Sequence, residues 1–372
     1  MVSKLIVTKI LFRHHEYITI YHVNLIFVIK IDFFLINYLF CIMSNVSDNC
    51  KDCNSQHQHL NFGYACLNTE LRKKDIFSSR TLRLATLEKK GIVYAKELAT
   101  KNLKDLLTIL KWNKDNGIFF FRISSELFPF ATYTKPINGI TPECNGDGKS
   151  SALYSLDFAD SLLKEIGDYA KANKIRLTMH PAQFCVLSSK SEDVVINAFS
   201  ELNHHCEILD RMGLGKDSVI IIHGGGVYGN KSKSLERLEE NIINLPKNTR
   251  DRLVLENCEM SYTVSDLLPL SEKLKVPIVI DYHHDSIYES QNSIEFYHER
   301  VFNVWFERGI KPKVHVSNSI PGIELNDTKT ARRKHSDYIQ YIHQPLLNIK
   351  FPIDVMLECK MKEQALLRLK NI

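Results

Sequence analysis

The chain of 372 residues lacks the features that mark several protein classes. Its nine cysteines are odd in number and scattered, which argues against a disulfide scaffold and favours a reducing, intracellular compartment. Cys50 and Cys53 have the spacing of half a zinc site, but no second pair completes it, so residues 43–60 are interpreted as a polar linker. A strong charge excess is also missing, since the net charge of +5 permits an acidic partner without requiring one.

The first 42 residues lack the pattern of a membrane anchor and of a secretion signal. Tyr21–Ile42 is apolar and long enough to span a bilayer, but Lys30 and Asp32 lie at its centre, where each costs roughly 2.5–3.5 kcal/mol. No small-residue cleavage site follows it. We therefore expect a non-globular extension without membrane association, translated from upstream sequence, with Met43 as the true start.

A regular alternation begins at Asn61, where short apolar runs rich in Val, Ile and Phe alternate with stretches of helical periodicity. Eight apolar runs separated by helices predict a parallel (β/α)8 TIM barrel that forms a single domain over residues 61–372. An open doubly wound sheet is the alternative, although no Gly-x-Gly-x-x-Gly follows the first run. The runs are Asn61–Leu67, Ile118–Ser125, Lys174–His180, Ser218–His223, Arg252–Glu256, Pro277–His284, Lys313–Ser317 and Asp354–Glu358. The expected helices include Leu156–Ala172, Val194–Met212, Ser234–Ile243, Val264–Leu274, Ile294–Glu307 and Lys362–Lys370.

Potential metal ligands stand at the ends of most of these runs. The active site of a TIM barrel lies at the carboxyl ends of its strands, so these side chains should converge at one rim. A divalent cation would relieve the repulsion among the buried carboxylates, and the mixture of His with Asp and Glu suits Zn, Mn or Fe better than Mg or Ca. The candidates are His180, His223, Glu256, Asp281, His284, His315 and Glu358, with His335 as a further ligand from a loop.

This ligand set is too large for one ion. Glu256 or Glu358 is suited to bridge two ions, and two neighbouring ions are a recurring device for hydrolysis of phosphodiesters by metal-activated water.

Nine short segments resemble, in order, those of the UV damage endonucleases, the repair enzymes that nick DNA beside ultraviolet photoproducts. Each segment is weak alone, but together they cover roughly residues 60–370. They are Gly63–Asn68, Phe121–Pro129, Met179–Phe184, Ile222–Gly226, Leu255–Asn257, Ile280–His284, Lys313–Ser317, His335–Tyr338 and Met356–Lys360.

The resemblance implies a TIM barrel that binds two or three divalent ions, generally Mn²⁺, through the eight ligands named above. It implies incision of damaged double-stranded DNA on the 5′ side of photoproducts and of other distorting or abasic lesions. Glu256, Lys313 and Glu358 would be catalytic, and Lys313 falls on a lysine near the metals that can be carboxylated.

The resemblance also implies residues for lesion recognition. Gln183 and Phe184 fall where the family has a Gln–Tyr pair that wedges into the duplex, and Tyr64 and Asn68 fall on contacts to the damaged strand. Chemistry on a stacked duplex requires distortion, which an aromatic wedge supplies at low cost where the bases are already unstacked. Packing of Phe184 in the core is the alternative.

One position departs from the family. A His usually follows Phe128 and Pro129 by about four residues, where this chain has Tyr133. A neutral Tyr, with a pKa of about 10, is a poor ligand, so a third metal site would be incomplete while two remain.

Two other functions compete with this interpretation: a sugar isomerase or epimerase, and a damage-binding protein without catalytic activity. A DNA enzyme needs basic residues around the metals to meet phosphates. We expect a monomer without a stable protein partner. The candidates for phosphate contact are Arg122, Lys231, Lys233, Arg332, Arg333 and Lys334.

Overall fold

The computed structural model describes residues 6–12, 15–22, 25–30, 59–138, 142–144 and 151–370, and the chain divides into two units, Met1–Gln56 and His57–Ile372. In the first unit, β1 (Ile6–Phe12), β2 (His15–His22) and β3 (Leu25–Lys30) form an antiparallel sheet. The sequence had predicted a non-globular extension without these strands. Their high content of Ile, Val, Phe and Tyr, which favour β-structure, accounts for the difference. The end of the apolar stretch beyond residue 30 and nearly all of the linker, with Cys50 and Cys53, lie outside the described residues.

The second unit contains a closed barrel of parallel strands in the order β10-β11-β12-β13-β4-β5-β8-β9. Each strand overlaps one predicted run, so the predicted TIM barrel is confirmed. Pairing of Ile353–Leu357 with Leu60–Tyr64 closes the barrel. The strands are β4 (Leu60–Ala65), β5 (Phe120–Ile123), β8 (Arg176–Met179), β9 (Ile220–His223), β10 (Leu253–Glu256), β11 (Ile278–Asp281), β12 (Lys313–Val316) and β13 (Ile353–Leu357).

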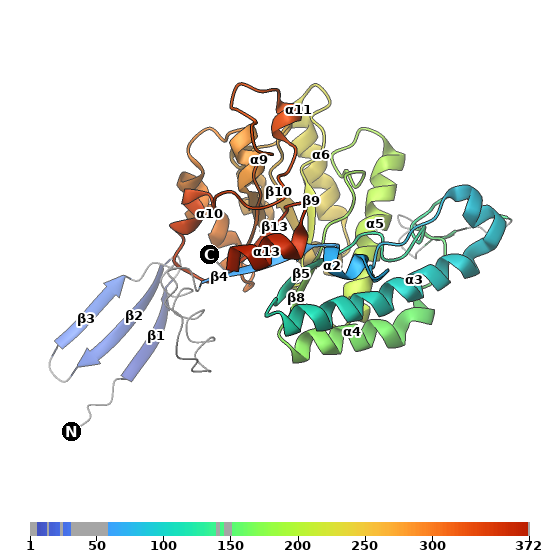
Figure 1. Ribbon diagram of the computed structural model, residues 1–372. Helices are drawn as coiled ribbons and strands as arrows, with labels where there is room; N and C mark the ends of the chain where they lie inside the picture. Colours follow the sequence, from blue (N-terminus) through green and yellow to red (C-terminus); the bar gives the residue numbers. More distant parts are fainter. Residues whose placement is uncertain are drawn as a thin grey trace. The chain divides into compact units, whose positions relative to one another are not determined.

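Helices cover the outside of the barrel (Figure 1). Three of them, α8 (Val264–Leu274), α10 (Ile294–Glu307) and α13 (Lys362–Lys370), occupy the predicted residues. No helix in the described part of the chain is long and apolar enough to cross a membrane. The other helices are α2 (Thr69–Arg72), α3 (Leu84–Asp115), α4 (Asp160–Ala172), α5 (Glu192–Arg211), α6 (Lys231–Asn244), α7 (Lys247–Arg252), α9 (Tyr282–Ile287), α11 (Lys329–Arg332) and α12 (Gln344–Leu347). The 3-10 helix η1 (Asp157–Ala159) precedes α4, and β6 (Glu143–Cys144) pairs with β7 (Ser151–Ala152).

Five of the barrel strands, β8, β10, β11, β12 and β13, are buried along their whole length, as in a parallel sheet that is covered on both faces. Close approach of β4 to β5 depends on Gly63, where a Cβ would lie only 2.2 Å from the carbonyl oxygen of Phe120. At the amino end of the barrel, the buried carboxylate of Asp354 pairs with Arg176, whose Nη1 lies 2.6 Å from its Oδ2, and with Lys311. The amino end of the barrel therefore contains buried ion pairs, while the carboxyl end carries the candidate ligands.

The predicted strand Pro277–His284 is too long. Strand β11 ends at Asp281, and α9 begins at Tyr282. The Asp281 carboxylate accepts a hydrogen bond from the backbone N–H of His284 at 2.8 Å, which caps the helix. His284 therefore reaches the rim from the first turn of a helix and not from a strand end.

Candidate active site and metal centre

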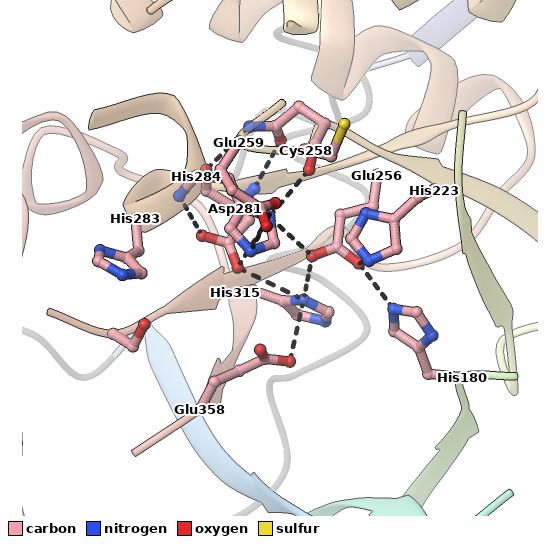
Figure 2. Close-up of polar contacts among 12 residues, drawn as sticks. His180, His223, Glu256, Cys258, Glu259, Asp281, His283, His284, His315 and Glu358 are labelled. Atoms are coloured by element: carbon pink, nitrogen blue, oxygen red, sulfur yellow. Dashed lines mark hydrogen bonds and ion pairs between the residues drawn. The ribbon is translucent and has the colours of Figure 1, made fainter. Parts of the chain in front are cut away.

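Glu256, the last residue of β10, lies at the centre of the candidate ligands (Figure 2). Its carboxylate is buried, with Oε2 at 2.9 Å from His180 Nε2 and Oε1 at 2.9 Å from His315 Nδ1. His223 approaches the same Oε2 at 3.9 Å. One carboxylate thus contacts imidazoles that follow or belong to three other strands.

Two groups of side chains in the described residues have ligand atoms within 4.8 Å of one another. One group is His180, His223 and Glu256, and the other is Glu256, Asp281 and His315. Because Glu256 belongs to both groups, the geometry favours it as the bridging carboxylate.

The remaining predicted ligands differ in their distance from these groups. His284 Nδ1 lies 3.6 Å from both Glu256 Oε1 and Asp281 Oδ2, and Glu358 Oε1 lies 3.4 Å from His315 Nδ1. His335 belongs to neither group, and its Nδ1 lies 2.6 Å from Ser317 Oγ. The structure therefore brings His284 and Glu358 against the two groups and leaves His335 beside them.

The chemistry of the donor set fits a divalent cation. Burial lowers the pKa of His223 and of His315 to about 4, so both imidazoles are neutral and offer a lone pair at neutral pH. Burial raises the pKa of Asp281 to about 7, with Glu256 adding to the effect. His223 Nδ1, Asp281 Oδ2 and His315 Nε2 are buried and accept or donate no hydrogen bond within the described residues. A shared cation would satisfy the carboxylates that now face one another.

Lys313 lies inside the barrel beside this cluster. Its side chain is fully buried, and its Nζ has no hydrogen-bond partner within the described part of the chain. Burial, aided by the charge of Arg122, holds the pKa of this amine well below its usual range. Its surroundings therefore favour the neutral, nucleophilic form of the amine over the ammonium form.

The loop after β8 is exposed next to these ligands. Gln183 is exposed and lines a cavity of about 250 Å³ together with His180 and His223. The side chain of Phe184 is 78% exposed, which contradicts the alternative that it packs in the core.

A family model described as UV-endonuclease UvdE matches residues 60–371. The chain belongs to this family. It is therefore a DNA repair endonuclease and a hydrolase, and the alternatives of a sugar isomerase and of a non-catalytic binding protein are set aside.

Relatives and a solved structure agree with this assignment. A putative UV-damage endonuclease of Acanthamoeba polyphaga mimivirus is 41% identical over 319 residues, which cover 83% of this chain and 90% of that protein. The UV-damage endonuclease of Schizosaccharomyces pombe is 38% identical over 82% of this chain, which spans about half of that protein, 49%. The crystal structure of SacUVDE superposes with a TM-score of 0.68 at 32% identity, covering 83% of this chain and 96% of that one.

Two residues that the UV damage endonuclease resemblance assigned to DNA contact are instead buried. Tyr64 and Asn68 are both 0% exposed. Tyr64 Oη donates to Asn113 Oδ1 at 2.6 Å and accepts from Asn68 Nδ2 at 3.1 Å, while Asn68 Oδ1 caps α2 by accepting from the backbone N–H of Leu71. This packing argues against the expected contacts, because neither side chain presents a surface to a DNA strand.

Tyr133 lines a different cavity from the one that contains the ligand residues of the endonuclease. It is partly buried and lines a second cavity, of about 500 Å³, together with Phe130 and Phe184. Its ring packs edge to face on Phe130 with 5.5 Å between centroids. The position that departs from the family is thus part of an aromatic pocket beside Phe184.

The endonuclease rim also holds a residue that the sequence patterns missed. Glu259 follows β10 by three residues and is largely buried, with Oε2 at 3.6 Å from His284 Nε2 and Oε1 paired with Arg333. The one sequence signal that could have identified Glu259 is its place three residues after Glu256, the last residue of a predicted strand. The pairing of Glu259 with Arg333 joins two loops that are distant in the sequence, so no local sequence pattern predicts it.

Proposed function

We propose that the protein nicks double-stranded DNA on the 5′ side of ultraviolet photoproducts, and of other distorting or abasic lesions, by metal-dependent hydrolysis. The observation that carries this proposal is the pair of ligand groups sharing Glu256, beside the exposed residues Gln183 and Phe184. Distorted or unpaired sites cost less to open than normal duplex, which would give selectivity for damage.

The donor set is suited to two Mn²⁺ ions, with Zn²⁺ as the other ion that mixed imidazole and carboxylate ligands accept. His180 and His223 would hold one ion, Asp281 and His315 the other, and Glu256 both. When bound, the ions supply Lewis-acid stabilisation of charge on the phosphodiester oxygens. His284, Glu358 and His335 would complete or orient these sites, and a third ion would depend on them.

The residues of the chain position this chemistry. Glu256 and Glu358 are held in place by neighbouring imidazoles, and Arg122 Nη1 lies 2.5 Å from Glu358 Oε1. Phe184 would enter the base stack, with Gln183 beside it. Lys313 would carry a carboxylate formed when its neutral Nζ bonds to the carbon of carbon dioxide and releases a proton.

One assay tests the proposal. The purified protein is incubated with Mn²⁺ and an end-labelled duplex that carries a single photoproduct, beside the same duplex without damage. We expect a nick at one position, 5′ to the lesion, in the damaged strand only. Equal cutting of the two duplexes, or none, would overturn the proposal, and a nick on the 3′ side would overturn its polarity.

We propose that residues 61–372 form the endonuclease domain and that residues 1–42 are dispensable for nicking. The family match begins at residue 60, which supports this division. Nicking by residues 43–372 should equal that of the full chain. Mass spectrometry of the native protein should find no peptide from residues 1–42, and such a peptide would contradict the upstream-sequence hypothesis.

A further inference from the structure

An ion pair lies at the mouth of the cavity that holds the candidate ligands. Arg333 Nε forms an ion pair with Glu259 Oε1, and both residues line the cavity of about 250 Å³ together with His180 and His223. The Arg333 side chain is 43% exposed, whereas that of Glu259 is 11% exposed. A positive group is thus held at the entrance, with part of its surface open to solvent.

Glu259 links this guanidinium to the metal-ligand cluster. Its Oε2 lies 3.6 Å from Nε2 of His284, while its Oε1 pairs with Nε of Arg333. The Nη groups of Arg333 make no hydrogen bond to the residues that the structure describes. A guanidinium fixed through Nε keeps its two Nη groups for another anion, and this planar fork matches two oxygens of a phosphate.

Three other basic residues with a predicted phosphate contact already pair with protein groups, so they are less suited to bind a phosphate. Arg122 is buried against Glu358, and Lys231 Nζ lies 2.7 Å from Asp266 Oδ2. Arg332 donates to the carbonyl oxygen of Ser286. Of the six basic residues with a predicted phosphate contact, Arg333 is the one that lines the ligand cavity.

We propose that Arg333 binds the phosphate that is cut, and that Glu259 is a positioning residue which holds the guanidinium toward it. The proposal rests on the endonuclease function proposed above. Negative charge grows on the phosphate oxygens during hydrolysis, so a fixed cation contributes most in the transition state. Arg333 is suited to this because a guanidinium stays charged at any pH of interest.

The first test replaces Arg333 in the metal-loaded protein and measures single-turnover nicking of the photoproduct duplex at saturating protein. We expect Arg333→Gln to lower the rate by about 10²-fold, with metal content and unfolding temperature unchanged. Arg333→Lys should recover part of the rate, because it keeps the charge and loses the fork. Absence of nicking by the unmodified protein would instead reject the proposed function.

The chain offers a matched control in Arg300, which is 50% exposed on α10. Its Nε lies 2.8 Å from Glu272 Oε1 and its Nη2 lies 2.6 Å from Glu272 Oε2, so an exposed Arg–Glu pair joins α10 to α8, and neither residue lines the ligand cavity. Arg300→Gln should leave nicking within about twofold of the unmodified protein, since exposed pairs contribute little. Equal losses for Arg333→Gln and Arg300→Gln would overturn the proposal.

A second measurement detects the phosphate contact itself. Each neutralised phosphate contributes about 0.9 to the slope of log affinity against log salt, so kcat/KM of Arg333→Gln should lose about one unit of slope. Arg300→Gln should keep the full slope. An unchanged slope for Arg333→Gln would show that Arg333 does not neutralise a phosphate and would overturn the proposal.

The positioning role of Glu259 has its own test. Glu259→Gln should lower kcat while KM and metal content stay near normal, because the guanidinium remains present but is less fixed. Glu272→Gln, the corresponding change in the control pair, should leave kcat unchanged. Loss of bound metal in Glu259→Gln would make Glu259 a ligand and would overturn its assignment as a positioning residue.

Discussion

Gln183 and Phe184 are adjacent in the chain but line different cavities. Gln183 faces the cavity that contains the metal-ligand residues, and Phe184 faces the pocket that contains Phe130 and Tyr133. Ala182 and Cys185 line both cavities, so this short segment forms the wall between them. A wedge at this wall would separate the bases on its two sides while keeping the backbone near the metals.

Truncation of Phe184 should therefore impair recognition and not folding. Stacking of a base on an aromatic side chain contributes about 1–3 kcal/mol, so Phe184→Ala should weaken binding of the photoproduct duplex about tenfold. Phe184→Tyr should bind normally, because the ring is kept. Affinity is measured by gel shift, and stability by thermal unfolding, which should not change because Phe184 is 78% exposed.

Phe296 provides the control for this prediction. It is 61% exposed on α10, outside the barrel, so Phe296→Ala removes a comparable ring without touching the wall between the cavities. Its affinity for the photoproduct duplex should equal that of the unmodified protein. If both alanine variants bind equally well, Phe184 is not the wedge.

Glu256→Gln should separate binding from cutting. The amide has no charge to offset a cation and cannot serve both ligand groups, so each group loses its shared carboxylate. We expect bound metal to fall, nicking to be abolished, and damaged DNA to bind within a few-fold of normal. Elemental analysis, the nicking assay and gel shift measure the three effects. Retained cutting would remove Glu256 from the active site.

Carboxylation of Lys313 is detectable by spectroscopy. Burial favours the neutral form of its Nζ, which is the form that reacts with carbon dioxide, and in ¹³C-labelled bicarbonate the protein should show a carbamate carbon resonance. Lys313→Gln should lose this resonance and nick more slowly. A resonance that persists in Lys313→Gln would place the carbamate elsewhere, and its absence from the unmodified protein would show that Lys313 stays a free amine.

The sequence predicts the barrel well because a parallel strand is buried on both faces and leaves an apolar run. It also predicts Glu256, His180 and His223, since a polar residue at the end of such a run must lie at the carboxyl rim. It does not predict that α9 begins directly after Asp281, because that depends on which backbone group the carboxylate caps.

Side-chain burial was the least predictable feature. Tyr64 and Asn68 belong to a recognised segment, but their hydrogen bonds involve Asn113, on a helix whose packing no local pattern specifies. The pairing of Glu259 with Arg333 likewise depends on how two loops meet at the rim. The burial of Tyr64 and Asn68 and the pairing of Glu259 with Arg333 thus both depend on contacts between segments that are distant in the sequence.

The amino end of the barrel yields a stability prediction that is independent of the metals. Asp354 is fully buried, with Arg176 Nη1 at 2.6 Å and Asn61 Nδ2 at 2.6 Å from its oxygens. Asp354→Asn leaves the buried guanidinium of Arg176 without a counter-charge, and breaking such a pair costs about 3–5 kcal/mol. The free energy of unfolding in urea at pH 7 should fall by this amount, while damaged-DNA nicking by the folded fraction is kept.

The same carboxylate makes a pH dependence that distinguishes ion pairing from packing. Burial alone would raise the pKa of Asp354, but Arg176 and Lys311 outweigh it and hold this pKa below the ordinary value of 3.8. A depressed native pKa stabilises the fold above the unfolded-state pKa, and this contribution is lost as the pH falls through the native pKa. The difference in unfolding free energy between the unmodified protein and Asp354→Asn should therefore be constant above about pH 5 and shrink below pH 4. A difference that stays constant through this acid range would mean that shape and hydrogen bonding, and not charge, make Asp354 stabilising.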